Sequence, residues 1–166
     1  HDIPISKTIL LIEDDEAVRD SVRMGLVQFG FQVLETSNGD DAAILCRAYE
    51  GKIDAAVIDM VMPRMWGHEI AAQLREISSR IKVVYISGHS EEFMLGCGVL
   101  KAEDVFFPKP FYPSELADKI YEMLGVPNPL MGSCPVADPA IRSQESTNMR
   151  GPTAATPADR PTGSGT

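Results

Sequence analysis

Five short apolar runs recur at regular intervals through the first 124 residues of the chain. They are rich in β-branched and aromatic residues and shorter than a typical helix, which predicts buried strands. The runs are Thr8–Ile12, Phe31–Glu35, Ala56–Ile58, Lys82–Ser87 and Val105–Phe107. Since continuous apolar strands are typical of parallel sheets, both faces of the predicted sheet should be covered.

An amphipathic helix is predicted after each strand. In the first, Val18, Val22, Leu26 and Phe29 recur at helical spacing and Gly30 ends the stripe. The other predicted helices run from Asn38-Gly39 to about Tyr49, from about Gly67 to Ser78, within Glu91–Leu100, and from Pro113 to Leu124. Gly96 and Gly98 predict that the fourth helix is short and mobile.

Strand and helix therefore alternate five times. This order predicts an α/β fold with right-handed crossovers and a parallel sheet between two layers of helices. The pattern ends near Leu124, because residues 125–166 hold seven of the 12 prolines and lack aromatic residues. We expect an N-terminal extension at 1–6, one folded domain at 7–124, and a disordered tail or linker rich in Pro, Gly, Ser and Thr at 125–166.

Composition narrows the function classes. The chain has 24 acidic and 15 basic residues, and three of each lie in 125–166, which leaves 21 acids and 12 bases in residues 1–124. Such a domain is a poor candidate for direct binding of nucleic acid. Three widely spaced cysteines suggest neither a disulfide framework nor a zinc site. With no apolar run long enough for a membrane span, we expect a cytoplasmic segment without membrane contact.

Polar side chains stand at the C-terminal ends of four predicted strands. Glu13 and Asp14 follow the first strand, Asp59 the third, Ser87 ends the fourth, and Lys109 follows the fifth. These ends of a parallel sheet are where ligands bind. Three converging carboxylates favour a hard divalent cation such as Mg²⁺, which often binds together with phosphate. Asp59 alone would be interpreted as a turn residue; its companions make it a candidate reactive group.

Four motifs in this order resemble the receiver domain of response regulators in bacterial two-component signalling. They are IEDDE at 12–16, IDMVMP at 58–63, ISG at 86–88 and FFPKPF at 106–111. The resemblance covers about residues 7–124 and implies a flavodoxin-like (βα)5 three-layer sandwich with strand order 2-1-3-4-5. It also implies a phosphoacceptor that takes a phosphoryl group from a phosphohistidine onto Asp59, with a histidine kinase or histidine phosphotransfer protein as partner.

The resemblance assigns roles to single residues. Glu13, Asp14, Asp59 and the backbone carbonyl of Val61 match the Mg²⁺ ligands, while Lys109 matches the catalytic lysine, Ser87 the switch hydroxyl, and Phe106 the aromatic residue that repacks with it. Asp15 should then point elsewhere. The face built from the fourth helix, fifth strand and fifth helix is expected to carry the output and a possible homodimer contact.

Other positions depart from the pattern or have ordinary explanations. Val61 and His89 match positions that often tune hydrolysis in the family that the chain resembles. An apolar Val61 cannot orient an attacking water, which predicts slow autodephosphorylation. Trp66 is a poor helix cap, and with Met62 and Met65 it is expected to pack rather than bind a cofactor. We expect His68 to be an exposed helix residue, and Cys46 and Cys97 to be buried or half-buried thiols.

Three alternatives stay open about the larger protein and its activity. The SGHSEE and FFPKPF segments resemble receivers at the C-terminal end of hybrid sensor histidine kinases, and the chain begins at His1, which favours a fragment of such a kinase over a free-standing single-domain response regulator. A pseudo-receiver that only binds a partner is a second alternative. The third, an aspartate-nucleophile phosphohydrolase, usually has a second Asp where this chain has Val61. Any enzymatic chemistry of the domain is expected to be limited to self-phosphorylation and autophosphatase activity.

Overall fold

A computed structural model describes residues 6–130 of the chain. Five strands form one parallel sheet in the order β2-β1-β3-β4-β5, which confirms the predicted topology. The strands are β1 (Thr8–Ile12), β2 (Gln32–Thr36), β3 (Ala55–Asp59), β4 (Lys82–Ser87) and β5 (Val105–Pro108). Residues 1–5 and 131–166, which include most of the expected extension and tail, lie outside the described part.

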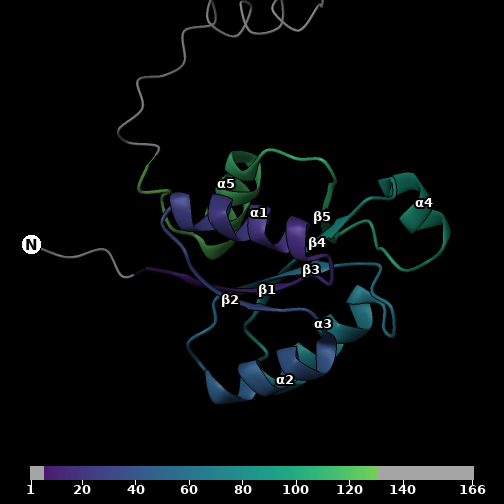
Figure 1. Ribbon diagram of the computed structural model, residues 1–166, viewed down its shortest axis with the longest axis horizontal. Helices are drawn as coiled ribbons and strands as arrows, with labels where there is room; N and C mark the ends of the chain where they lie inside the picture. Colours follow the sequence, from purple (N-terminus) through teal and green to yellow (C-terminus); the bar gives the residue numbers. More distant parts are fainter. Residues whose placement is uncertain (1–5, 131–166) are drawn as a thin grey trace, which may run out of the picture. The chain divides into compact units, whose positions relative to one another are not determined.

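Five helices cover the sheet, and Figure 1 shows α1 and α5 on one face with α2 and α3 on the other. The helices are α1 (Glu16–Gln28), α2 (Gly39–Ala48), α3 (Gly67–Ile77), α4 (Glu91–Gly96) and α5 (Pro113–Leu124). Met94 of α4 is fully buried in the same apolar cluster as residues of α2 and α3. The predicted three-layer arrangement is therefore confirmed.

The core explains why the strand sequences are apolar without alternation. In β1, Leu10 and Ile12 pack into the cluster on the α2/α3 side, while Ile9 and Leu11 pack into the cluster on the α1/α5 side. Successive strand residues point to opposite faces. A strand at the centre of a sheet with helices on both faces therefore needs apolar residues at every position.

Strand β2 begins one residue later than the sequence predicts. The Phe31 backbone N–H donates to the Leu26 carbonyl at 3.1 Å, so it belongs to the turn that follows α1. The Phe31 ring stacks on Tyr121 of α5 with centroids 4.3 Å apart. A buried aromatic residue directly before a strand resembles a strand residue in sequence, so the apolar pattern did not separate Phe31 from β2.

Helix α4 is short, as predicted, and ends at Gly96. Gly98 has a φ of 72°, a left-handed conformation that turns the chain away from the helix. Cys97 is exposed, so the prediction of a buried or half-buried thiol is wrong there, whereas Cys46 is buried as expected. The helix ends before Cys97, which therefore does not continue the buried side of α4 marked by Met94.

Helix α3 starts in close contact with the end of β3. The Gly67 N–H donates to the Met60 carbonyl at 2.8 Å. A Cβ on Gly67 would lie 2.7 Å from both the Asp59 carbonyl oxygen and the Met60 Cα. At the preceding residue the Glu69 carboxylate accepts the Trp66 N–H at 2.9 Å, which is the half of a capping box that the third helical residue makes.

We expect Gly67→Ala to destabilise the domain by about 1–3 kcal/mol, the usual cost of adding a carbon to a filled space. The atoms in the way are backbone atoms at the end of β3 and cannot rotate aside. Chemical denaturation should show a lower midpoint. Gly96→Ala is the matched control, because a Cβ there meets nothing within 4 Å. Equal stability of the two variants would contradict the steric argument.

Candidate functional site

The C-terminal ends of β1 and β3 bring three carboxylates together. One oxygen from each of Glu13, Asp14 and Asp59 lies within 4.8 Å of the others. Glu13 and Asp59 are only 1% and 6% exposed, whereas Asp14 is exposed to solvent. β1 and β3 are adjacent strands whose last residues lie side by side. The sheet order, rather than sequence proximity, creates this cluster.

Lys109 is the cation that faces the cluster. Its Nζ donates to Glu13 Oε2 at 2.7 Å and to Asp59 Oδ2 at 3.1 Å. The loop after β5 carries this lysine, and the Lys109 backbone N–H donates to the Ser87 carbonyl at 2.7 Å. The following peptide bond, Lys109-Pro110, is cis. Residues nearly 100 positions apart in sequence are thus joined in one ion-pair network.

Burial and neighbouring charges shift two pKa values in this network. Burial raises the pKa of Glu13 from 4.5 to about 7; the hydrogen bond from Lys109 opposes this rise and the charge of Asp59 adds to it. Burial lowers the pKa of the Lys109 ammonium, but its hydrogen bond to Glu13 and the charges of Asp59 and Glu13 outweigh burial, so the pKa is raised overall. Lys109 therefore stays positively charged at neutral pH.

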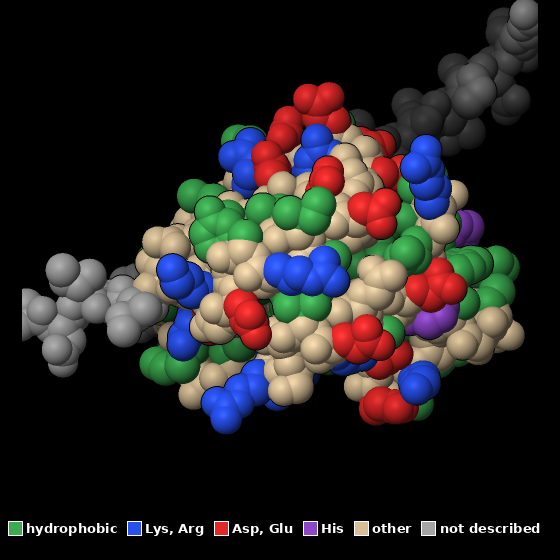
Figure 2. Space-filling model, turned by 90° about the horizontal axis from the view of Figure 1, so that it is seen from below, with side chains coloured by type: hydrophobic (Ala, Val, Ile, Leu, Met, Phe, Trp, Pro, Cys, Tyr) green, Lys and Arg blue, Asp and Glu red, His purple; other side chains and the backbone are tan. Residues whose placement is uncertain are grey.

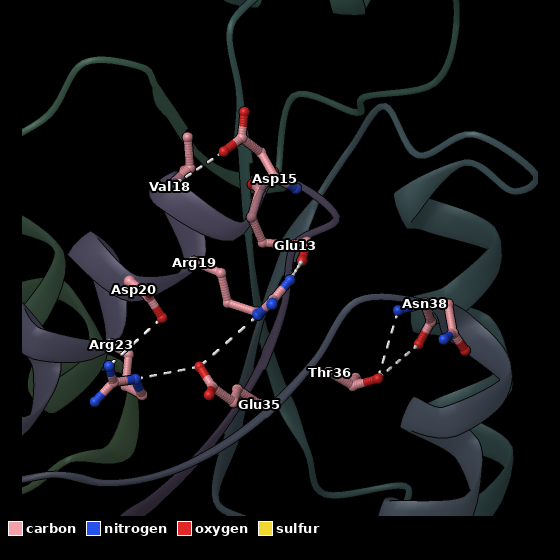
Figure 3. A network of polar contacts seen from close by, with 9 residues as sticks. All are labelled: Glu13, Asp15, Val18, Arg19, Asp20, Arg23, Glu35, Thr36 and Asn38. Atoms are coloured by element: carbon pink, nitrogen blue, oxygen red, sulfur yellow. Dashed lines mark hydrogen bonds and ion pairs between the residues drawn. The ribbon is translucent and has the colours of Figure 1, made fainter.

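The turn that carries Glu13 is fixed by several hydrogen bonds (Figure 3). The Glu13 N–H donates to the Thr36 carbonyl of β2 at 3.1 Å, and Glu13 Oε1 accepts the Asp15 N–H at 3.2 Å. The Glu13 carbonyl accepts from Arg19 Nη1 at 2.9 Å. Asp15 itself points to α1, where its carboxylate accepts the Val18 N–H.

Sequence reasoning did not identify Arg19 as part of this site. It lies on α1, one turn after the N-cap residue Asp15, and not at a strand end. The only signal in the sequence was its place next to Val18 in the stripe that faces the sheet. That signal cannot distinguish an arginine that reaches the site from one that extends into solvent.

The Asp59 carboxylate is also held by its own loop. Its Oδ1 accepts the Val61 N–H at 3.0 Å. Val61 and Trp66 are joined by a single antiparallel bridge and are 37% and 40% exposed. Two accessible apolar side chains therefore border the loop beside Asp59. Met62 and Met65 pack against the core, as expected of residues that pack and do not bind a cofactor, whereas Trp66 is not part of that apolar cluster.

The remaining site candidates lie around the end of β4. Ser87 is fully buried, and its Oγ accepts the His89 N–H at 3.1 Å. The exposed His89 ring stacks on Phe93 of α4 with centroids 5.0 Å apart. Phe106 on β5 is half-buried against the cluster on the α2/α3 side. Ser87 and Phe106 thus lie on the neighbouring strands β4 and β5. Phe106 pairs with Tyr85, two residues before Ser87.

His68 differs from its expected exposed position. It is half-buried at the start of α3, and its Nδ1 is buried without a hydrogen-bond partner in the described part of the chain. The ring lies 6.5 Å from Trp66. The expectation of an exposed helix residue is therefore wrong for His68, and helical periodicity alone did not predict its partial burial.

The cluster suits a hard divalent cation. Carboxylate oxygens are the ligands that Mg²⁺ prefers, and it commonly uses one or two of them together with water and phosphate oxygens. Glu13, Asp14 and Asp59 supply such oxygens from two rigid strand ends, and two of them are nearly buried. The donor set offers no sulfur or imidazole that would favour a softer metal.

The α2/α3 side of the domain carries both acidic and basic side chains (Figure 2), in line with the composition of the chain. Figure 2 shows the α2/α3 side, where acidic, basic and hydrophobic side chains are interspersed. Such a mixed surface differs from the continuous basic patches that bind nucleic acid. Within residues 6–130, no helix has the length and apolar character needed to cross a membrane.

Comparisons with known proteins agree with the fold and the motifs. The Response regulator receiver domain family matches residues 9–121. The sensor kinase CckA of Brucella abortus is 35% identical over 123 residues, which cover 74% of this chain and 13% of that kinase. The chain thus spans a small part of this relative.

Solved structures show the same similarity. The receiver domain of the hybrid histidine kinase CckA has a TM-score of 0.60 and 29% identity, covering 70% of this chain and 98% of that one. The response regulator TrrA of Thermotoga maritima, solved in complex with Mg(2+)-BeF, has a TM-score of 0.60 and 25% identity over 70% of this chain and 98% of its own. The chain therefore belongs to the response regulator receiver domain family of two-component signalling.

Proposed function

We propose that Asp59 is the phosphoacceptor of this receiver domain, and that residues 7–124 form the receiver while 125–166 form a tail or linker. The observation that carries the proposal is the position of the Asp59 carboxylate. One oxygen faces Lys109 Nζ, the other accepts the Val61 N–H, and the acids Glu13 and Asp14 lie beside it. A nucleophile held between a cation and a metal-binding cluster suits phosphoryl transfer, in which the protein mainly positions groups and offsets charge.

Glu13, Asp14 and Asp59, with the Val61 backbone carbonyl, would hold Mg²⁺. When bound, Mg²⁺ offsets the negative charge that carboxylates and phosphoryl oxygens bring to one place. The TrrA complex with Mg(2+)-BeF supports this assignment by similarity.

The reaction follows from the positions of the residues. An oxygen of Asp59 attacks phosphorus, the bond from phosphorus to the donor histidine nitrogen breaks, and its electron pair goes to that nitrogen while the imidazole takes up one proton from solvent. An acyl phosphate on Asp59 and a neutral histidine result. Lys109 Nζ lies within hydrogen-bond distance of Asp59 and can donate to a phosphoryl oxygen there. The donor is a histidine kinase or a histidine phosphotransfer protein.

We propose that Ser87 and Phe106 form the switch. The Ser87 hydroxyl would turn from its bond with the His89 N–H towards the new phosphoryl oxygen. Movement of the buried hydroxyl would let the half-buried Phe106 repack and change the surface of α4, β5 and α5. Two states that differ by one such contact need only a few kcal/mol to exchange populations. This surface is the proposed output face and possible homodimer contact.

The larger protein is proposed to be a hybrid sensor histidine kinase. This segment would lie in the cytoplasm and make no direct contact with nucleic acid or membrane. The similarity to CckA supports the assignment to a hybrid kinase. A free-standing response regulator is the competing possibility. A non-phosphorylated pseudo-receiver would not need the paired Lys109 and the three-carboxylate cluster.

The proposed function is tested by phosphorylation of the full chain. Incubation with Mg²⁺ and a small-molecule phosphodonor, followed by mass measurement of intact protein, should show the addition of one phosphoryl group. Omission of Mg²⁺ should prevent the addition. Failure to acquire the group under conditions that phosphorylate a known receiver would overturn the proposal in favour of a pseudo-receiver.

We expect the acyl phosphate to be long-lived, and Val61→Asn to shorten its half-life several-fold. Val61 is 37% exposed beside Asp59 and offers no polar atom in its side chain to orient water. An amide could do so. The half-life is measured after removal of the donor in the presence of Mg²⁺. Val27→Asn, at an exposed position on α1, serves as control. An unchanged half-life in Val61→Asn would show that this side chain does not limit hydrolysis.

A further inference from the structure

The side chain of Arg19 joins α1 to the backbone of the acidic turn. Its Nη1 donates to the Glu13 carbonyl at 2.9 Å, and its Nε lies 3.9 Å from Glu35 Oε2 on β2. Figure 3 shows the guanidinium extended between these two groups. The Arg19 side chain is 18% exposed. The guanidinium is therefore mostly shielded from solvent and held by polar contacts on two sides.

The atom that Arg19 holds lies between two proposed metal ligands. The Glu13 carbonyl belongs to the rigid, planar peptide that joins Glu13 to Asp14. Since the Glu13 N–H is bonded to the Thr36 carbonyl, the backbone of Glu13 is restrained on both sides. A fixed peptide plane limits where the Asp14 carboxylate can go. Arg19 thus acts on the ligand pair through the backbone and does not bind the ligand oxygens.

Glu35 and Arg23 support Arg19 from the other side. Arg23 Nε lies 3.2 Å from the same Glu35 Oε2, and Arg23 Nη2 lies 3.5 Å from Asp20. Arg23 stands one helical turn after Arg19 and shares its carboxylate, but its polar contacts are to Asp20 and Glu35, whereas the Glu13 carbonyl is bonded by Arg19. The two arginines have the same charge and neighbouring positions, and they differ in the contact with the turn.

We propose that Arg19 is a positioning residue that orients the Glu13–Asp14 ligand pair for a divalent cation. The proposal rests on the proposed function, because it assumes that the carboxylate cluster binds Mg²⁺. The proposal also predicts whether loss of Arg19 weakens or tightens cation binding. A nearby positive charge alone repels a cation, so loss of Arg19 would tighten binding if charge were its main influence. Loss of an orienting contact weakens binding.

Mg²⁺ affinity of the full 166-residue chain, measured by calorimetric titration, tests the proposal. We expect Arg19→Met to bind Mg²⁺ about tenfold more weakly than the unaltered protein, the lower end of the usual effect of removing a group that orients metal ligands. Arg23→Met, with the same loss of charge, should keep the original affinity. Arg19→Lys, which retains a charged donor, should lie between Arg19→Met and the unaltered protein.

Unfolding midpoints measured in a chelator separate positioning from general stability. Arg19→Met and Arg23→Met each lose an ion-pair partner of Glu35 and should have similar midpoints without metal. Equal Mg²⁺ affinities of these two variants, or tighter binding by Arg19→Met, would overturn the proposal. If Arg19→Met does not fold, an Arg19→Lys affinity equal to that of the unaltered protein would overturn it. Absence of Mg²⁺ binding by the unaltered protein would instead refute the proposed function, and this inference with it.

Discussion

Asp59→Asn protein should acquire no phosphoryl group from a small-molecule donor in the presence of Mg²⁺, while the unaltered protein acquires one. The substitution preserves the shape of the side chain and replaces a nucleophilic carboxylate oxygen by a neutral amide. It also removes one of the three acids of the cluster. Intact-protein mass spectrometry measures the result directly.

Asp40→Asn is the matched control for this prediction. Asp40 is an exposed acid in the first turn of α2, so the same chemical change is made outside the site. This variant should be phosphorylated to the same extent as the unaltered protein. Addition of a phosphoryl group to Asp59→Asn would show that another residue is the acceptor, and the proposed role of Asp59 would be wrong.

Lys109→Met should slow phosphorylation by about 100-fold or more, the usual consequence of losing a charged donor aimed at developing charge. Lys109 Nζ lies 3.1 Å from Oδ2 of the proposed nucleophile Asp59, and the burial of Asp59 strengthens the electrostatic effect of the lysine. The rate is followed with a small-molecule donor at saturating Mg²⁺. The acceptor is still present in this variant, so slow phosphorylation should remain detectable.

The same variant should bind Mg²⁺ at least as tightly as the unaltered protein. In the structure, the Lys109 ammonium contacts oxygens of Glu13 and Asp59 that are proposed to hold the metal. Its removal frees those oxygens and removes a repulsive charge. Lys119→Met on α5, where the lysine pairs with Glu122, is the control and should change neither quantity. An unchanged phosphorylation rate in Lys109→Met would contradict the role given to this lysine.

Asp59→Asn removes the acceptor together with one of the three proposed metal-binding acids. Lys109→Met removes a charge that assists transfer and leaves the proposed metal ligands in place. Arg19→Met is expected to act on metal affinity alone. These three residues therefore predict different combinations of affinity and rate, which measurements on one domain can distinguish.

The sequence by itself determined the fold class and most members of the site. Short apolar runs of three to six residues followed by helical stripes are compatible with few arrangements other than a parallel sheet covered on both faces. Once that sheet is accepted, the polar residues that follow its strands must meet at one edge. Periodicity and chain order are both contained in the sequence, and together they place Glu13, Asp14, Asp59 and Lys109 at that edge.

The tertiary structure decided which side chains actually touch. It paired Lys109 with both Glu13 and Asp59, held the Glu13 carbonyl with Arg19, and placed Gly67 against the backbone of β3. It also placed Phe31 in a turn and exposed Cys97. These outcomes depend on contacts between segments far apart in the chain and on where a helix ends to within one residue. Local preferences determine neither the contacts between distant segments nor the last residue of a helix, since packing between elements overrides those preferences.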